Sequence, residues 1–188
     1  LIASRRQIDS KYFGGGYVNN WSTEEFSKYV KNRDKIGLTY LARDHGGPWQ
    51  SDIERNERFG LREAMESAKK SFKADIDAGF QILHLDPSID IDGPLKVEDS
   101  LERLFELYDF CCNYAKKQGK EIIYEIGTEE QSGSTNTQEE LEFTLSKINE
   151  FCTKNKYPKP TFVVIQTGTK VKELRNIGSL DSSFRVKK

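Results

Sequence analysis

The feature that most constrains the fold is a short apolar, β-branched run that recurs along the chain. Four such runs, at residues 36–43, 80–86, 121–127 and 161–167, begin roughly 40 residues apart, and a helical pattern fills each interval. This alternation is typical of parallel strands joined by helical crossovers. With residues 1–3 counted as a further strand, the sequence predicts an α/β domain with five strands.

Two of the helices have recognisable ends. Ser22 and Glu25 stand at the first and last positions of an S-x-x-E capping box, which predicts that a helix begins there. A second helix carries apolar residues at three- and four-residue spacing from Leu61 to Phe72, and we expect it to end at Gly79.

Two architectures fit this alternation. The length of 188 residues suits an open doubly wound sheet, because a complete eight-stranded barrel needs roughly 250 residues. No G-x-G-x-x-G or G-K-[ST] pattern follows a predicted strand, which counts against the nucleotide-binding versions of the open sheet. Polar residues at the strand ends favour a piece of a barrel instead.

Composition excludes two classes of partner. The chain has 29 Lys and Arg against 30 Asp and Glu, so we expect neither nucleic acid nor an anionic membrane surface as a partner. No apolar run approaches the roughly 20 residues that a membrane span needs. The three cysteines, Cys111, Cys112 and Cys152, lack CxxC spacing. They are typical of reduced core thiols, which favours a soluble, cytoplasmic protein.

Polar side chains stand where the predicted strands end. The first strand runs into Asp44 and His45, the second finishes with His84 and Asp86, and the third contains Glu125. Strand periodicity places His84 and Asp86 on one face, opposite two leucines that suit a helix layer. Imidazoles and carboxylates are common ligands of a catalytic divalent metal. The alternative is that each of them hydrogen-bonds within a polar loop, with Asp44 capping the turn that follows.

Five segments in order carry a family resemblance. Residues 44–48 are similar to an Asp-His-x-Gly-Pro motif, and residues 78–88 follow an Ala-Gly-Phe…His-Leu-Asp-x-Ser pattern. Residues 1–15, 126–129 and 164–168 resemble three further strand-end segments. Together they resemble the class II D-tagatose-bisphosphate aldolase family, and in particular its subunit commonly called non-catalytic.

The resemblance implies a TIM (β/α)8 barrel. Residues 1–188 would form a single partial-barrel domain that covers only about strands two to six. A later family segment with another strand-end histidine has no counterpart in this sequence, so we expect this stretch alone to be inactive. Residues 130–134 and the two threonines around Gly168 depart from the family pattern, and we expect the pocket loops and the sugar to differ accordingly.

The resemblance also implies roles for individual residues. Asp44 would transfer the proton at the hydroxyl of the breaking bond, and His45 and Glu125 would bind a divalent metal, usually zinc. The residues implied to contact the substrate, a phosphorylated ketose, are Gln7, Asp86 and Gln166.

These roles predict a lyase of carbohydrate metabolism. The chain would carry out metal-assisted retro-aldol cleavage of a tagatose-bisphosphate-type substrate, or support a catalytic aldolase subunit within an oligomer. One alternative is a subunit that only stabilises such a chain. Another is a different metal-dependent sugar-phosphate barrel enzyme, such as an epimerase.

Overall fold

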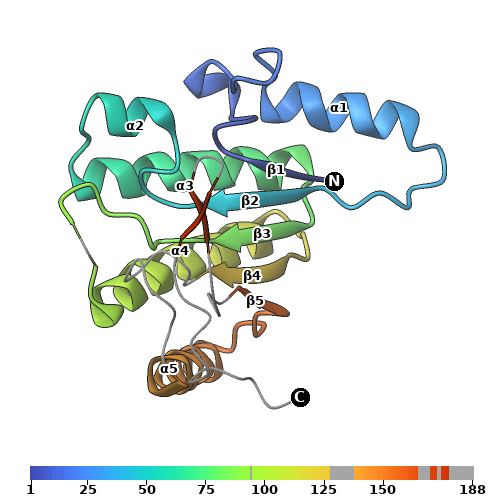
Figure 1. Ribbon diagram of the computed structural model, residues 1–188. Helices are drawn as coiled ribbons and strands as arrows, with labels where there is room; N and C mark the ends of the chain where they lie inside the picture. Colours follow the sequence, from blue (N-terminus) through green and yellow to red (C-terminus); the bar gives the residue numbers. More distant parts are fainter. Residues whose placement is uncertain (94, 128–137, 165–169, 173–174, 178–188) are drawn as a thin grey trace.

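Five parallel strands form the central sheet of the computed structural model, which describes residues 1–93, 95–127, 138–164, 170–172 and 175–177 (Figure 1). They lie side by side in chain order, each paired with the next strand along the sequence. The strands are β1 (Ile2–Ser4), β2 (Ala42–Gly46), β3 (Ile82–Leu85), β4 (Ile123–Gly127) and β5 (Phe162–Val164). The predicted α/β class and the five strands are therefore confirmed.

The helices follow the strands as crossovers. The long ones are α1 (Thr23–Arg33), α3 (Leu61–Ala78), α4 (Val97–Lys117) and α5 (Gln138–Asn155). The short elements are a 3-10 helix (Lys11–Phe13), α2 (Asp52–Asn56) and an antiparallel hairpin of β6 (Lys170–Lys172) and β7 (Arg175–Ile177). Among the described helices, none is long and apolar enough to cross a membrane.

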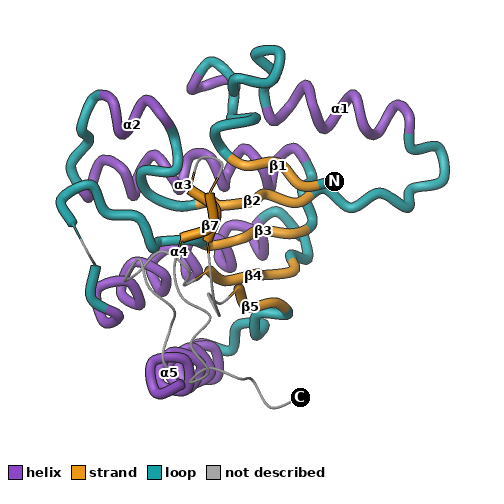
Figure 2. Tube along the Cα trace, in the orientation of Figure 1, coloured by secondary structure: helices purple, strands orange, loops and turns teal. Residues whose placement is uncertain are grey.

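The order of the elements distinguishes a barrel segment from a doubly wound sheet. Helix α1 packs on α3, α3 on α4, and α4 on α5, so the helices follow the strands as one layer. Figure 2 shows α3 and α4 lying behind the sheet on the same side. A doubly wound sheet reverses its strand order and carries helices on both faces. Consecutive parallel strands with one helix layer are the arrangement of a (β/α)8 barrel.

The core lies between the sheet and this helix layer. Leu83 and Leu85 of β3 and Tyr124 and Ile126 of β4 are buried there among apolar residues of α3 and α4. The alternate residues of β3 and β4 therefore face the other side of the sheet, as predicted from the period of two. His84 is one of them.

The strand predicted at residues 36–43 was given too early a start. The sequence predicted a strand at 36–43, but β2 begins at Ala42, and Ile36 and Leu38 are exposed. The Asp34 carboxylate accepts hydrogen bonds from the backbone N–H groups of Gly37, Leu38 and Thr39. This local turn replaces ladder pairing, a role for which short acidic side chains are suited.

The predicted capping box at the start of α1 is confirmed. Ser22 Oγ accepts from the Glu25 backbone N–H at 3.2 Å, and the Glu25 carboxylate accepts from the Ser22 N–H at 3.1 Å. We expect Ser22→Ala to lower the free energy of unfolding by about 1 kcal/mol, because the Glu25 backbone N–H loses its acceptor. Urea unfolding measures the loss. Ser146→Ala, at an exposed position of α5, is the control and should be neutral or slightly stabilising; an equal loss in both variants would contradict the capping role.

An ion-pair cluster joins the outer faces of α3 and α4. Arg62 donates to Glu106 at 2.8 Å and Lys69 Nζ lies 2.7 Å from it, and these contacts lower the pKa of Glu106 from 4.5 to about 2. A lowered carboxyl pKa stabilises the fold above its unfolded value, so this contribution is complete above about pH 4.5 and is lost as the pH falls toward 2.

The cluster is partly open to solvent, with the Arg62 side chain 67% and that of Glu106 33% exposed, so its effect should be small. We expect Glu106→Gln to cost less than about 1 kcal/mol at pH 6, with the difference from wild type narrowing by about pH 3 and in high salt. Urea unfolding at both pH values measures this. A difference that grows toward low pH would contradict the assigned direction.

Candidate metal site

Three potential metal ligands meet where β2 and β3 end. Asp44 and His45 are on β2 and His84 is on β3, and each offers a ligand atom within 4.8 Å of the others. His84 Nδ1 lies 3.4 Å from Asp44 Oδ1, and His45 Nε2 lies 3.9 Å from the same oxygen. His84 is buried, whereas the side chains of Asp44 and His45 are each 37% exposed. The cluster is therefore enclosed at His84 and open to solvent at Asp44 and His45.

A β-bulge brings adjacent residues of β2 to this common site. Neighbouring side chains of a regular strand point to opposite faces. Here the pairing register between β2 and β3 shifts between Arg43 and Gly46, and His45 adopts a left-handed backbone conformation with φ of 43°. Such bulges re-aim side chains next to active sites. The His45 backbone N–H also donates to His84 Nδ1 at 3.3 Å, which ties the bulge to β3.

Asp86 holds the His45 ring from behind. It is fully buried just past β3, and its Oδ2 lies 2.6 Å from His45 Nδ1. Gln50 Nε2 donates to the same oxygen at 2.7 Å, while the Ser88 hydroxyl and backbone N–H donate to Oδ1. Burial alone would raise the pKa of Asp86, but the hydrogen bond to His45 and the charge of His84 together lower it. Asp86 is therefore an ionised acceptor.

Two glycines let the loop after β2 approach the end of β3. A Cβ atom at Gly47 would lie 2.0 Å from the Asp86 carbonyl oxygen, and one at Gly46 would lie 2.4 Å from the Phe72 ring. The Gly46 carbonyl also accepts from the Asp86 backbone N–H at 2.7 Å. Only glycine fits at such close backbone contacts. The Gly46-Gly47 pair thus sets the distance between His45 and Asp86.

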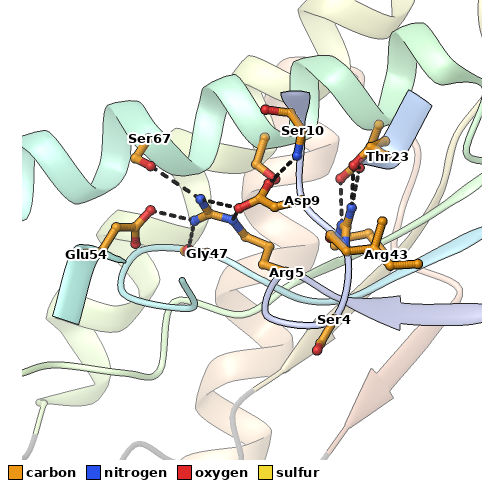
Figure 3. Close-up of polar contacts among 12 residues, drawn as sticks. Ser4, Arg5, Asp9, Ser10, Thr23, Arg43, Gly47, Glu54 and Ser67 are labelled. Carbon is orange, nitrogen blue, oxygen red and sulfur yellow. Dashed lines mark hydrogen bonds and ion pairs between the residues drawn. The ribbon is translucent and has the colours of Figure 1, made fainter. Parts of the chain in front are cut away.

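A buried arginine fastens the same loop from the other side (Figure 3). Arg5, directly after β1, donates to the Gly47 carbonyl at 3.0 Å, and its guanidinium pairs with Asp9 at 3.2 Å and Glu54 at 2.8 Å. The side chains of Arg5 and Glu54 are only 1% exposed. Arg5 and Gln50 were not predicted from the sequence to support the site. The one feature of the sequence that could indicate them is position, since Arg5 follows β1 and Gln50 follows the glycine pair after β2.

The electrostatics of the cluster suit a cation. The neighbouring His84 ring lowers the pKa of Asp44, and the charge of His45 acts in the same direction. Asp44 is therefore a carboxylate under ordinary conditions. Two imidazoles and one carboxylate form a donor set that zinc accepts, and catalytic zinc sites use three protein ligands with a further position open to substrate. The donor set fits a divalent metal of this kind.

Two other predicted site residues, Glu125 and Gln7, lie outside the three-residue cluster. Glu125 is the register partner of His84 on β4 and is half-buried, but it is not a member of the three-residue group. Gln7 lies at the end of β1, where its Oε1 accepts from the Ser4 backbone N–H at 2.9 Å. Gln166 falls outside the described residues. His84 was predicted to share a strand face with Asp86 but not to bind the metal. The structure places it in the cluster.

Two solved structures resemble this chain to different degrees. A solved structure described as a probable tagatose 6 phosphate kinase from Sinorhizobium meliloti 1021 is similar, with a TM-score of 0.65 and 22% identity. The match covers 94% of this chain but only 44% of that one. A 3-keto-D-glucoside 4-epimerase from E. coli matches with a TM-score of 0.42 and 14% identity, over 77% of this chain and 53% of that one.

The family assignment comes from the sequence match. A comparison with curated proteins found no match. The family described as D-tagatose-1,6-bisphosphate aldolase subunit GatZ/KbaZ-like matches residues 7–159, a stretch that contains the whole candidate site. The chain belongs to the GatZ/KbaZ-like family of tagatose-bisphosphate aldolase subunits.

Proposed function

We propose that this chain is part of an aldolase subunit that binds a divalent metal, zinc by preference, and takes part in retro-aldol cleavage of a phosphorylated ketose. The observation that carries the proposal is the Asp44, His45 and His84 cluster at the ends of two barrel strands. Catalytic groups of (β/α)8 barrels gather at this carboxyl edge. Family membership supplies the substrate class.

The residues divide between metal binding and proton transfer. His45 and His84 would hold the metal, with Glu125 beside His84 as a further carboxylate. The bound metal would polarise the ketose carbonyl and stabilise the charge that develops on it. Asp44, ionised and 37% exposed, would accept the proton of the hydroxyl at the bond that breaks. Gln7 and Gln166 would contact the substrate.

Asp44 and His45 can be told apart by experiment with the full-length protein. Zinc content and cleavage of tagatose 1,6-bisphosphate are measured side by side. We expect His45→Ala to lose zinc and activity together. Asp44→Asn should keep zinc and lower kcat by about 10²–10⁴-fold, the usual effect of removing a proton-transfer group. Asp52→Asn, at a surface acid whose side chain is 58% exposed, is the control and should change neither.

The family description favours a second candidate, because it names a subunit. In this version the chain supports a catalytic aldolase chain and cleaves nothing itself. The same preparation would then be inactive alone, yet would raise the activity of an added class II aldolase chain, and His45→Ala would leave that stimulation unchanged. Activity of the isolated full-length protein that depends on His45 would exclude this candidate.

A further inference from the structure

The carboxylate of Asp86 makes four hydrogen bonds directly behind the His45 ring. Oδ2 lies within hydrogen-bonding distance of His45 Nδ1 and Gln50 Nε2, at 2.6 and 2.7 Å. Oδ1 accepts from the Ser88 backbone N–H at 3.1 Å and from the Ser88 hydroxyl. Asp86 is fully buried, so it has no exposed surface to offer a substrate in this conformation.

These contacts determine where the proton of His45 lies. A carboxylate with no proton of its own can only accept hydrogen bonds. The Ser88 backbone N–H is always a donor, and the Gln50 amide nitrogen is a donor as well. The short contact at Oδ2 is therefore made by a proton on His45 Nδ1. In a neutral imidazole the lone pair is then on Nε2, which is the nitrogen that lies on the Asp44 side.

We propose that Asp86 is a positioning residue that fixes His45 as the Nδ1–H tautomer and so presents Nε2 to the site. The sequence resemblance gave Asp86 a substrate-binding role, whereas its burial and contacts support this one. A carboxylate behind a histidine ligand orients the ring and raises its basicity, and losing it costs about 10–100-fold in metal affinity. This inference rests on the proposed function, because binding of the metal by His45 is what gives Nε2 its role.

Asp86→Asn provides a specific test because the surrounding donors determine how the new amide is oriented. The Ser88 N–H requires an oxygen at the Oδ1 position, so the amide NH2 must take the Oδ2 position. That NH2 donates to His45 Nδ1, and Gln50 can turn its own amide to accept the second proton. Every group stays paired, so the fold should be retained. His45 must then change to the Nε2–H tautomer, as an imidazole does when its orienting carboxylate becomes an amide.

The measurement is long-range ¹H–¹⁵N NMR of the histidine rings in the metal-free, full-length protein at about pH 8, where histidine is ordinarily neutral. We expect a protonated Nδ1 and an unprotonated Nε2 for His45 in the wild type, and the reverse in Asp86→Asn. Gln81→Leu is the control, because Gln81 accepts from the Leu41 backbone N–H where β2 and β3 begin, away from the site. It should leave the His45 tautomer unchanged.

The tautomer of His45 tests this inference, whereas zinc binding tests the proposed function. A wild-type His45 that carries its proton on Nε2 overturns the inference, even if Asp86→Asn fails to fold. An unchanged tautomer in a folded Asp86→Asn variant overturns it too. The expected tautomers in a protein that binds no zinc would support the positioning role of Asp86 and count against the metal site. In a zinc-binding protein, Asp86→Asn should weaken zinc affinity by about 10–100-fold.

Discussion

Replacing Arg43 with leucine is expected to lower the free energy of unfolding by about 3–5 kcal/mol, because it leaves the buried carboxylate of Asp75 without its partner. Arg43 lies on β2 with its side chain in the helix layer, and it is fully enclosed. Its guanidinium donates to Asp75 at 2.6 and 2.9 Å. Figure 3 shows Arg43 beside Thr23. Burial raises the pKa of Asp75, and the Arg43 charge opposes that rise, while the Asp75 charge raises the pKa of Arg43 against its own burial. Both Asp75 oxygens accept from the guanidinium, so the geometry is that of an ionised pair.

Every donor of Arg43 has a partner, which explains why the pair is tolerated in the core. Nη1 also donates to the backbone carbonyls of Ala3 and Ile8, and Nη2 donates to Thr23 Oγ1. Arg43 thus joins β1, β2, α1 and α3. Arg43→Lys should also destabilise the fold, since an ammonium group cannot reproduce this fork.

Arg62→Leu is the matched control. It breaks an arginine–carboxylate pair whose arginine side chain is 67% exposed, so it should cost less than about 1 kcal/mol. Urea unfolding of the full-length variants measures both losses. Equal, small losses at the two positions would contradict the structural role assigned to the buried pair.

Gly47→Ala should damage the fold and the metal site together. The new methyl group would lie 2.0 Å from the Asp86 carbonyl oxygen, a backbone atom that cannot move aside without displacing the end of β3. We expect a loss of about 3 kcal/mol in the free energy of unfolding, at the upper end of the usual cost of overpacking. Because the loop and Asp86 must separate, the contact between His45 and Asp86 should break, and zinc affinity should fall at least about 10-fold.

Gly60→Ala separates this steric effect from the general effect of adding a methyl group. Gly60 precedes α3 on the surface, and among the described residues, its two chain neighbours aside, no atom lies within 4 Å of an added Cβ. Its substitution should cost a few tenths of a kcal/mol and leave zinc binding unchanged. Thermal unfolding and zinc titration of both variants test the comparison. Normal zinc affinity in a folded Gly47→Ala variant would contradict the role given to the loop.

The sequence could predict the layers of this fold because local patterns agree with it. The leucines of β3 alternate with His84, and the apolar spacing of α3 ends at Gly79, which adopts the left-handed conformation expected of a helix end. The start of β2 could not be predicted in the same way. Ile36 and Leu38 alternate like strand residues, but the Asp34 turn takes up the nearby backbone N–H groups.

The sequence could predict most residues of the site but not their arrangement in space. Strand ends indicated Asp44 and His45, but regular alternation would place them on opposite faces. The bulge that unites them depends on a positive φ at His45, which no pattern in the sequence marks. Asp86 could be placed on the right face, yet its burial behind His45 depends on Gln50 and Ser88 closing around it in space.

The central claim is that His45 and His84 bind a divalent metal next to Asp44, and zinc titration of the full-length protein by calorimetry tests it most directly. We expect roughly one zinc ion per chain in the wild type, as in catalytic zinc sites that hold a single metal. His84→Ala, which removes the buried member of the cluster, should abolish that binding while Gly60→Ala preserves it. Zinc binding that survives in both His45→Ala and His84→Ala would contradict the account.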